Sequence, residues 1–110
     1  MKDTNLGAFE ELVLLAVGSL EDNAYGVTIK DALVEQTGRA PSIGSLHSAL
    51  YRLEGKGYLT SEDGGATNER GGRRKRYFRL SASGLKALET AHELRIAFSS
   101  KIPGLNLKNS

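Results

Sequence analysis

The hydrophobic pattern of this 110-residue chain changes its period near residue 58. Before that point, apolar residues recur at helical spacing, and after it they alternate with polar ones around a glycine-rich connection. Helical spacing buries one stripe of a helix, whereas alternation buries one face of a strand. The chain is therefore limited to a mainly α (α+β) fold in which helices come first and a hairpin follows.

The first half of the chain predicts three helices. Apolar spacing indicates one over about 6–20 and a second over about 25–36, with Gly38 directly after its end. Ser42 is a good N-cap for a third helix, which ends near residue 55 or 57. The inward side of this third helix carries Leu46, Leu50 and Leu53.

Two strands and a fourth helix follow. Residues 58–62 and 75–80 suit strands, and the glycines between them predict a β-hairpin. Ser81 is an N-cap candidate for a helix over 81–99. Three helices followed by a hairpin make a winged helix-turn-helix, with a three-helix core, a two-stranded wing and a C-terminal dimerisation helix. We expect one domain over residues 1–100 and a flexible tail over 101–110.

Positive charge is concentrated in one part of the chain. Residues 1–69 hold 5 Lys/Arg and 11 Asp/Glu, whereas residues 70–110 hold 10 and 2. Six of the 15 basic residues lie between Arg70 and Arg79, in the predicted wing. This asymmetry suggests a polyanionic partner, and a solvated loop with incidental charge is the alternative.

The outward side of the third helix combines small, polar and planar side chains, without Glu or Lys. A helix that reads bases in the major groove needs close approach and hydrogen-bond donors, while a wing contacts the neighbouring backbone. An ordinary solvated helix face is the alternative interpretation. The predicted DNA-binding residues are Ser42, Gly44, Ser45, His47, Ser48, Tyr51 and Arg52 on the helix, and Arg70, Arg73, Arg74, Lys75 and Tyr77 on the wing.

Two runs, SIGSLHSALYRLEGKGYLTSE and GGRRKRYFRLSASGLKAL, resemble the PadR family of bacterial transcriptional regulators. The resemblance covers about residues 6–98 and includes Ala24-Tyr25-Gly26, similar to the family's opening of its second helix. The chain departs from the family at His47-Ser48, where Tyr-Pro is common. The resemblance implies a short-form dimeric repressor that binds double-stranded DNA, and some members respond to aromatic or lipophilic ligands.

The fourth helix carries a second apolar stripe at i, i+4, i+7 and i+11, while Leu85 and Leu88 can pack onto the domain's own core. We predict a symmetric homodimer that reads a pseudo-palindromic operator. Packing of this stripe on the first helix of the same chain is the alternative. A pocket for an effector could form between the first and fourth helices near Phe9, Leu94 and Phe98, but aromatic stripes at helical spacing more often belong to the core. The predicted dimer residues are Phe9, Leu12, Ala87, Ala91, Leu94 and Phe98.

Other classes of function find little support in the sequence. The chain has no cysteine, and His47 and His92 lie on separate helices without an acidic partner set, so we expect no catalytic site, metal or cofactor. Glu10 and Glu11 are expected to form a solvated surface. The longest uncharged apolar run, 12–20, is too short to span a bilayer, and we expect a cytoplasmic protein. A winged-helix module that binds protein or RNA without operator specificity is the main alternative.

Overall fold

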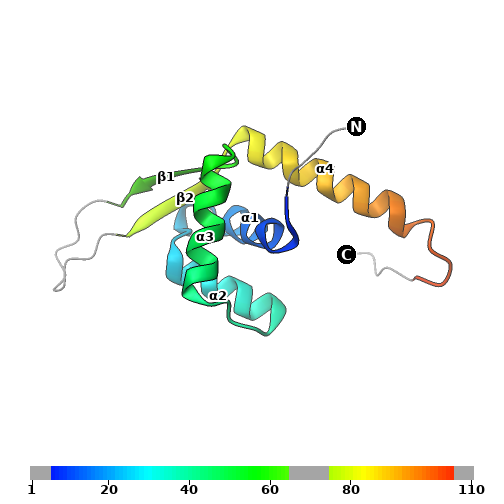
Figure 1. Ribbon diagram of the computed structural model, residues 1–110, viewed down its shortest axis with the longest axis horizontal. Coiled ribbons are helices and arrows are strands. Elements are labelled where there is room, and N and C mark those ends of the chain that lie inside the picture. The colour runs from blue at the N-terminus through cyan, green and yellow to red at the C-terminus, as the bar shows by residue number, and fades with distance from the viewer. Residues whose placement is uncertain (1–5, 65–74, 106–110) are drawn as a thin grey trace.

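The computed structural model describes residues 6–64 and 75–105. The order of elements agrees with the prediction, and the mainly helical winged helix is confirmed (Figure 1). The elements are α1 (Ala8–Leu20), the 3₁₀ turn η1 (Glu21–Asn23), α2 (Gly26–Thr37), α3 (Ile43–Gly55), β1 (Leu59–Asp63), β2 (Arg76–Leu80) and α4 (Ala82–Ser99).

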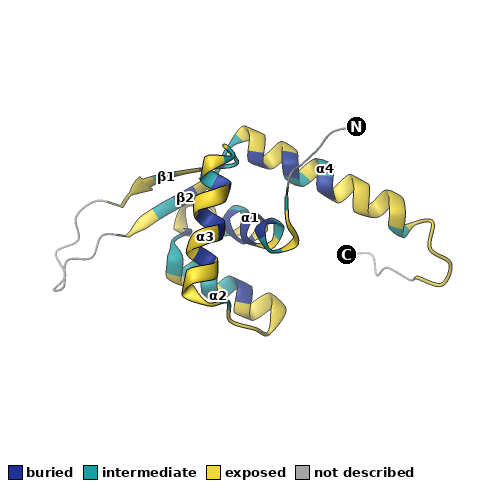
Figure 2. Cartoon of the chain, viewed as in Figure 1, coloured by how far each residue is buried: buried dark blue, intermediate teal, exposed yellow. Residues whose placement is uncertain are grey.

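The core is built around α1, which contacts α2, α3, α4 and β2. Val13 and Leu14 of α1 are fully buried. Leucines of α3 and the strand residues Leu59 and Phe78 close around them. Figure 2 shows buried segments, in dark blue, on α1 and α3. Burial of this apolar surface fixes which side of α3 points inward and therefore which side remains outward.

The predicted helix ends are confirmed. The Ser42 hydroxyl accepts a hydrogen bond from the Ser45 N–H at 3.1 Å, and the Ser81 hydroxyl accepts one from the Gly84 N–H at 3.0 Å. Both bonds satisfy an amide that has no partner within its helix. Gly38 ends α2 with φ of 79°, a conformation that favours glycine.

The wing is a two-stranded antiparallel sheet whose register pairs Leu59 with Leu80 and Asp63 with Arg76. The Phe78 N–H donates to the Ala24 carbonyl at 2.8 Å, which attaches β2 to the segment before α2. Residues 65–74 connect the strands and lie outside the described residues, as do Arg70, Arg73 and Arg74 of the predicted interface.

The N-terminal part of α4 packs closely on the body of the protein, and its C-terminal part projects away, although Arg95 still pairs with Glu11 of α1 (Figures 1 and 2). Helix α4 and the wing extend in opposite directions, which gives the molecule an elongated shape, 56 × 29 × 23 Å (Figure 1). After α4, residues 101–105 continue in turns in which the Lys101 N–H donates to the Phe98 carbonyl at 3.0 Å. Residues 106–110 of the predicted tail lie outside the described part of the chain. None of the helices described has the length and hydropathy needed to cross a bilayer.

The structure corrects the predicted faces of α4. Ala87 and Ala91, assigned to a contact with a second copy, are buried within the protomer with exposures of 6% and 7%. Leu85, expected in the core, is 51% exposed. The physical reason is that small residues let the α4 backbone come close to its neighbours, so that Gly84 lies against the Tyr58 backbone. Packing within the protomer therefore accounts for Ala87 and Ala91, the first two residues of the second apolar stripe of α4.

Replacement of Gly84 by alanine tests this close approach. A Cβ at Gly84 would overlap the backbone carbonyl of Tyr58, and we expect Gly84→Ala to lower the free energy of unfolding by about 1–3 kcal/mol. Gly55→Ala at the end of α3 is the matched control, because a Cβ there would meet open space. Urea denaturation measures both variants, and equal midpoints would contradict the proposed packing.

Candidate nucleic-acid interface

The predicted helix residues share one exposed surface, which we call the α3 outer face. None of its members is a carboxylate, and Tyr51 is 81% exposed. The only acidic residue of α3, Glu54, accepts a hydrogen bond from the Ser61 hydroxyl of β1 at 2.7 Å. The face therefore offers donors and little negative charge. Its residues are Ser42, Gly44, Ser45, His47, Ser48, Tyr51 and Arg52.

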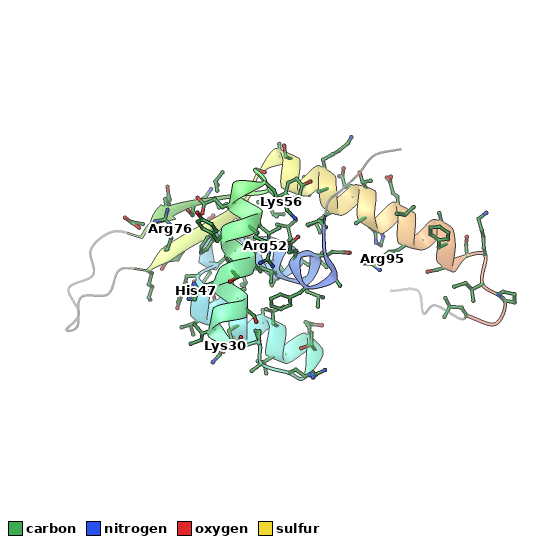
Figure 3. All side chains as sticks on the ribbon, viewed as in Figure 1. Lys30, His47, Arg52, Lys56, Arg76 and Arg95 are labelled. Carbon is green, nitrogen blue, oxygen red and sulfur yellow. The ribbon has the colours of Figure 1, made fainter. Side chains whose placement is uncertain are left out.

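A groove of about 420 Å³ separates α3 from the wing. Residues of α3 line one side of it, and Arg76 and Phe78 of β2 line the other. The α3 lining is His47, Ser48, Leu50, Tyr51 and Glu54. Figure 3 shows His47 on the wing side of α3 and Arg52 on the side nearer α1. The fold thus brings a basic strand beside the outer face. Arg76 was left out of the predicted site because the sequence did not settle which way it faces.

Lys75 and Tyr77 of the predicted interface lie at the end of the wing nearer the connecting residues 65–74, and both contact Tyr25. The Tyr25 and Tyr77 rings meet edge to face with centroids 5.3 Å apart, and the Lys75 ammonium lies 4.6 Å from the Tyr25 centroid. Tyr77 also covers Gly64, where a Cβ would overlap the ring. Tyr77 is therefore a half-buried anchor of the wing, whereas Lys75 remains exposed.

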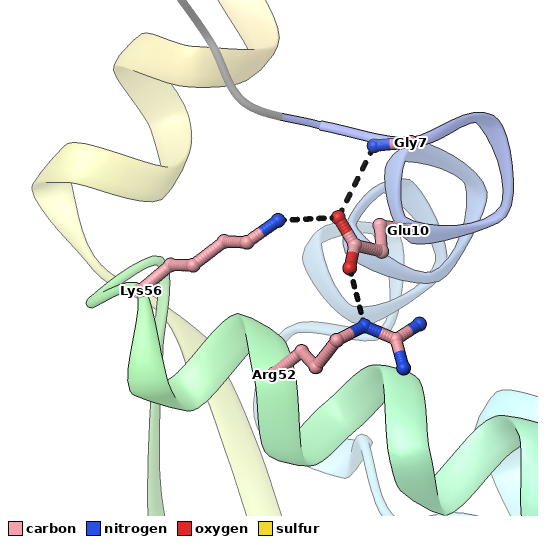
Figure 4. Close-up of polar contacts among 4 residues, drawn as sticks. All are labelled: Gly7, Glu10, Arg52 and Lys56. Atoms are coloured by element: carbon pink, nitrogen blue, oxygen red, sulfur yellow. Dashed lines mark hydrogen bonds and ion pairs between the residues drawn. The ribbon is translucent and has the colours of Figure 1, made fainter.

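Glu10 lies beneath this surface, and its predicted solvated position is wrong. It is 6% exposed, and its carboxylate accepts hydrogen bonds from Arg52 Nε at 2.7 Å, Lys56 Nζ at 2.7 Å and the Gly7 N–H at 3.1 Å (Figure 4). A signal was present in the sequence, because Glu10 continues the buried helical series of Val13 and Leu14 at i+3 and i+4. The carboxylate joins α1 to α3.

Glu11 is also paired rather than freely solvated, and it joins α1 to α4. Its carboxylate accepts two hydrogen bonds from Arg95, at 3.1 Å from Nε and 2.6 Å from Nη2. These residues help to line a groove of about 450 Å³ between the two helices. Leu94 and Phe98 line it as expected, but Phe9 packs against the core instead. The described residues include no group of three His, Cys, Asp or Glu that could hold a metal ion.

The environment of Glu10 strongly favours its ionised form. Burial alone would raise the pKa of this carboxyl, but hydrogen bonds from Arg52, Lys56 and Gly7 outweigh it and lower the pKa from 4.5 to about 2. A carboxyl whose pKa falls on folding stabilises the folded state fully above its unfolded pKa. Its contribution therefore disappears as the pH falls from 4.5 to about 2.

Acid unfolding of Glu10→Gln tests this contribution. The parent should lose up to about 3 kcal/mol of unfolding free energy from Glu10 across this pH window. Glu10→Gln should be less stable at pH 7 and should show a correspondingly smaller loss on acidification. Glu93→Gln, which neutralises an exposed carboxylate, is the control and should follow the parent. Chemical denaturation at several pH values measures the effect, and parallel curves for parent and Glu10→Gln would contradict it.

Comparisons with known proteins agree with this architecture. The model of the Transcriptional regulator PadR-like family matches residues 14–90. A transcriptional regulator from Clostridium thermocellum is 25% identical, with a TM-score of 0.68 over 83% of this chain and 82% of that one. A comparison with curated proteins found no match.

Two further solved structures support the fold alone. A PadR-like transcription factor from Bacteroides fragilis is 20% identical with a TM-score of 0.71, covering 84% of each chain. A PadR-like transcriptional regulator from Bacillus cereus is 19% identical with a TM-score of 0.69, covering 94% of this chain and 95% of that one. With its family model matched over most of the described fold, the chain belongs to the PadR-like family of transcriptional regulators and is not an enzyme.

Proposed function

We propose that the protein is a sequence-specific DNA-binding repressor of the cytoplasm, which acts as a dimer on a pseudo-palindromic operator. The observation that carries this proposal is the α3 outer face, exposed, free of carboxylates and flanked by a basic strand. A major groove about 12 Å wide admits an α-helix, and Ser45 and Ser48 are short donors that allow close approach. Tyr51 would lose much of its exposed surface against DNA.

The wing is proposed to bind phosphates on either side of the groove. Lys75 and Arg76 lie at its outer end, next to the connecting residues, and both are exposed, although Arg76 also pairs with Asp63 at 2.9 Å. Such an exposed pair contributes little and can exchange its carboxylate for a phosphate. Each phosphate contact adds about 0.9 to the slope of log affinity against log salt. Arg70, Arg73 and Arg74, outside the described residues, are proposed to add further contacts.

Exposed apolar side chains support association through α4 and α1. On the projecting half of α4, Leu94 is 47% and Phe98 64% exposed, and Leu12 and Leu15 of α1 are 41% and 48% exposed. A second copy that covered them would present two α3 helices to half-sites about 34 Å apart. Ala87 and Ala91 no longer belong to this proposed interface, because the protomer itself buries them.

As a second, subordinate proposal, the groove between α1 and α4 binds an aromatic or lipophilic effector. Its volume of about 450 Å³ lies within the range of small-molecule sites. Leu6, Leu94 and Phe98 provide apolar lining, and the Glu11–Arg95 pair provides polar groups. A ligand there would contact the same helices that form the proposed dimer.

Ser48→Glu tests the role of the α3 outer face. A carboxylate at this exposed position would face DNA phosphates, and we expect affinity for random-sequence duplex at low salt to fall about tenfold or more. Ser83→Glu is the matched control, because it adds the same charge at an exposed position in the first turn of α4, where an acid is tolerated. Fluorescence anisotropy over a salt series measures both variants.

The same salt series separates the rival functions. The parent should lose affinity steeply as salt rises, because DNA binding releases counterions. Equal binding by the parent and both variants would exclude α3 as the contact surface. Binding of a protein partner that persists at high salt, with no binding to duplex DNA, would support the protein-interaction module instead.

Phe98→Glu, combined with Leu94→Glu, tests the proposed dimer. Two charges in an apolar contact cannot be buried without partners, so we expect the double variant to sediment as a folded monomer. Val27→Glu is the control, because Val27 is 60% exposed and belongs to α2, a helix that lies away from α4 in Figure 1. Analytical ultracentrifugation distinguishes the species, and an unchanged dimer in the α4 variant would place the interface elsewhere.

A further inference from the structure

We infer that Glu10 is a positioning residue for DNA binding: it holds Arg52 so that the arginine presents its free end to a phosphate of the duplex. The inference rests on the proposed DNA-binding function and assigns a role to a residue that lies beneath the contact surface. Glu10 itself does not face the DNA, since its side chain is 8% exposed, whereas that of Arg52 is 52% exposed.

The carboxylate holds Arg52 by a single atom. Glu10 Oε2 accepts from Arg52 Nε at 2.7 Å, while Oε1 is occupied by Lys56 Nζ at 2.7 Å and the Gly7 N–H at 3.1 Å. Because Oε1 already has two donors, the carboxylate binds Nε alone rather than two guanidinium nitrogens. Figure 4 shows the two terminal nitrogens of Arg52 turned away from Glu10.

The free end of Arg52 suits an anion with two adjacent oxygens. The guanidinium is planar, and its terminal N–H groups match the spacing of two phosphate oxygens. Lys56 supplies a second positive charge to Glu10, so the three side chains together keep a net charge of +1. The attraction of Arg52 for an anion is therefore not cancelled by the carboxylate that holds it.

The place of Arg52 on α3 favours a phosphate over a base edge. Arg52 lies near the C-terminal end of the helix, on the flank nearer α1, whereas His47 lies on the wing side (Figure 3). When a helix enters the major groove, side chains on its flanks meet the walls of the groove, which are made of sugar and phosphate. Contacts to these walls position the protein and do not depend on sequence.

The bond from Glu10 fixes the Arg52 side chain before DNA binds. It should raise affinity for DNA, because a mobile arginine loses rotamer freedom when it binds. An immobilised long side chain changes affinity by a factor of about two to twelve. Long-range electrostatics predicts the opposite sign for Glu10→Gln. Removal of a negative charge makes the protein more cationic and would strengthen its attraction to DNA. The direction of the change therefore separates the two effects.

The experiment measures affinity for random-sequence duplex DNA with the parent, Glu10→Gln, Arg52→Lys and the double variant. We expect Glu10→Gln to bind about three- to tenfold more weakly. Arg52→Lys keeps the charge but lacks Nε and the planar fork, and in that background Glu10→Gln should cause no further loss. Glu62→Gln, at an exposed position on β1, is the control and should bind at least as tightly as the parent.

Each outcome decides between named alternatives. If Glu10→Gln binds as well as the parent or better, or weakens binding equally in both backgrounds, the positioning role is overturned while DNA binding stands. If the parent does not bind duplex DNA, the proposed function itself fails. An unchanged salt slope in Arg52→Ala, instead of a decrease of about 0.9, would overturn the phosphate assignment.

Denaturation curves for every variant exclude unfolding as the cause of a loss. If Glu10→Gln does not fold, Arg52→Lys and Arg52→Ala provide the test. The Arg52 side chain is 52% exposed and that of Glu10 is 8% exposed, so replacement of Arg52 should destabilise the fold less. In that case Arg52→Lys should bind about three- to tenfold more weakly than the parent. Equal binding by Arg52→Lys and the parent would show that a point charge suffices and would overturn the inference.

Discussion

The buried carboxylate of Glu10 joins α1 to α3 and adds a specific polar contact to their apolar packing. A buried charge is costly unless it is paired and hydrogen-bonded, and Glu10 has three donors within 3.1 Å. Two of these donors come from the last turn and the C-cap of α3, so the apolar contact between the helices gains a polar contact of defined geometry. Loss of a donor would remove part of what offsets the burial of this carboxylate, which makes the cluster sensitive to substitution.

Adjacent glutamates on α1 point to different parts of the molecule. Glu10 binds α3, which carries the outer face, and Glu11 binds Arg95 of α4. Successive residues of a helix are separated by about 100° around its axis, so neighbours in sequence face different partners. Helix α1 therefore connects the proposed DNA contact with the groove and the apolar surface proposed for effector binding and dimerisation.

Much of this architecture could be predicted from local patterns. Ser42 and Ser81 act as N-caps where expected, and the leucines of α3 face inward, because these features depend on short-range hydrogen bonds and helical spacing. The exposure of Ser48 and Tyr51 followed directly from the inward leucines. Ala87 and Ala91 were misassigned because an alanine is equally compatible with a tight contact inside the protomer and with a surface between protomers.

The sequence by itself determined the order of helices and strands, the outward side of α3 and the position of the basic hairpin in the chain. Each of these features depends on periodicity or on residues close in the chain. Only the tertiary structure decided that Glu10 is buried and bonded to Arg52 and Lys56, and that Ala87 and Ala91 of α4 are covered by their own protomer. Glu10 and Arg52 are 42 residues apart. Their contact depends on how the helices pack, which a local pattern does not specify.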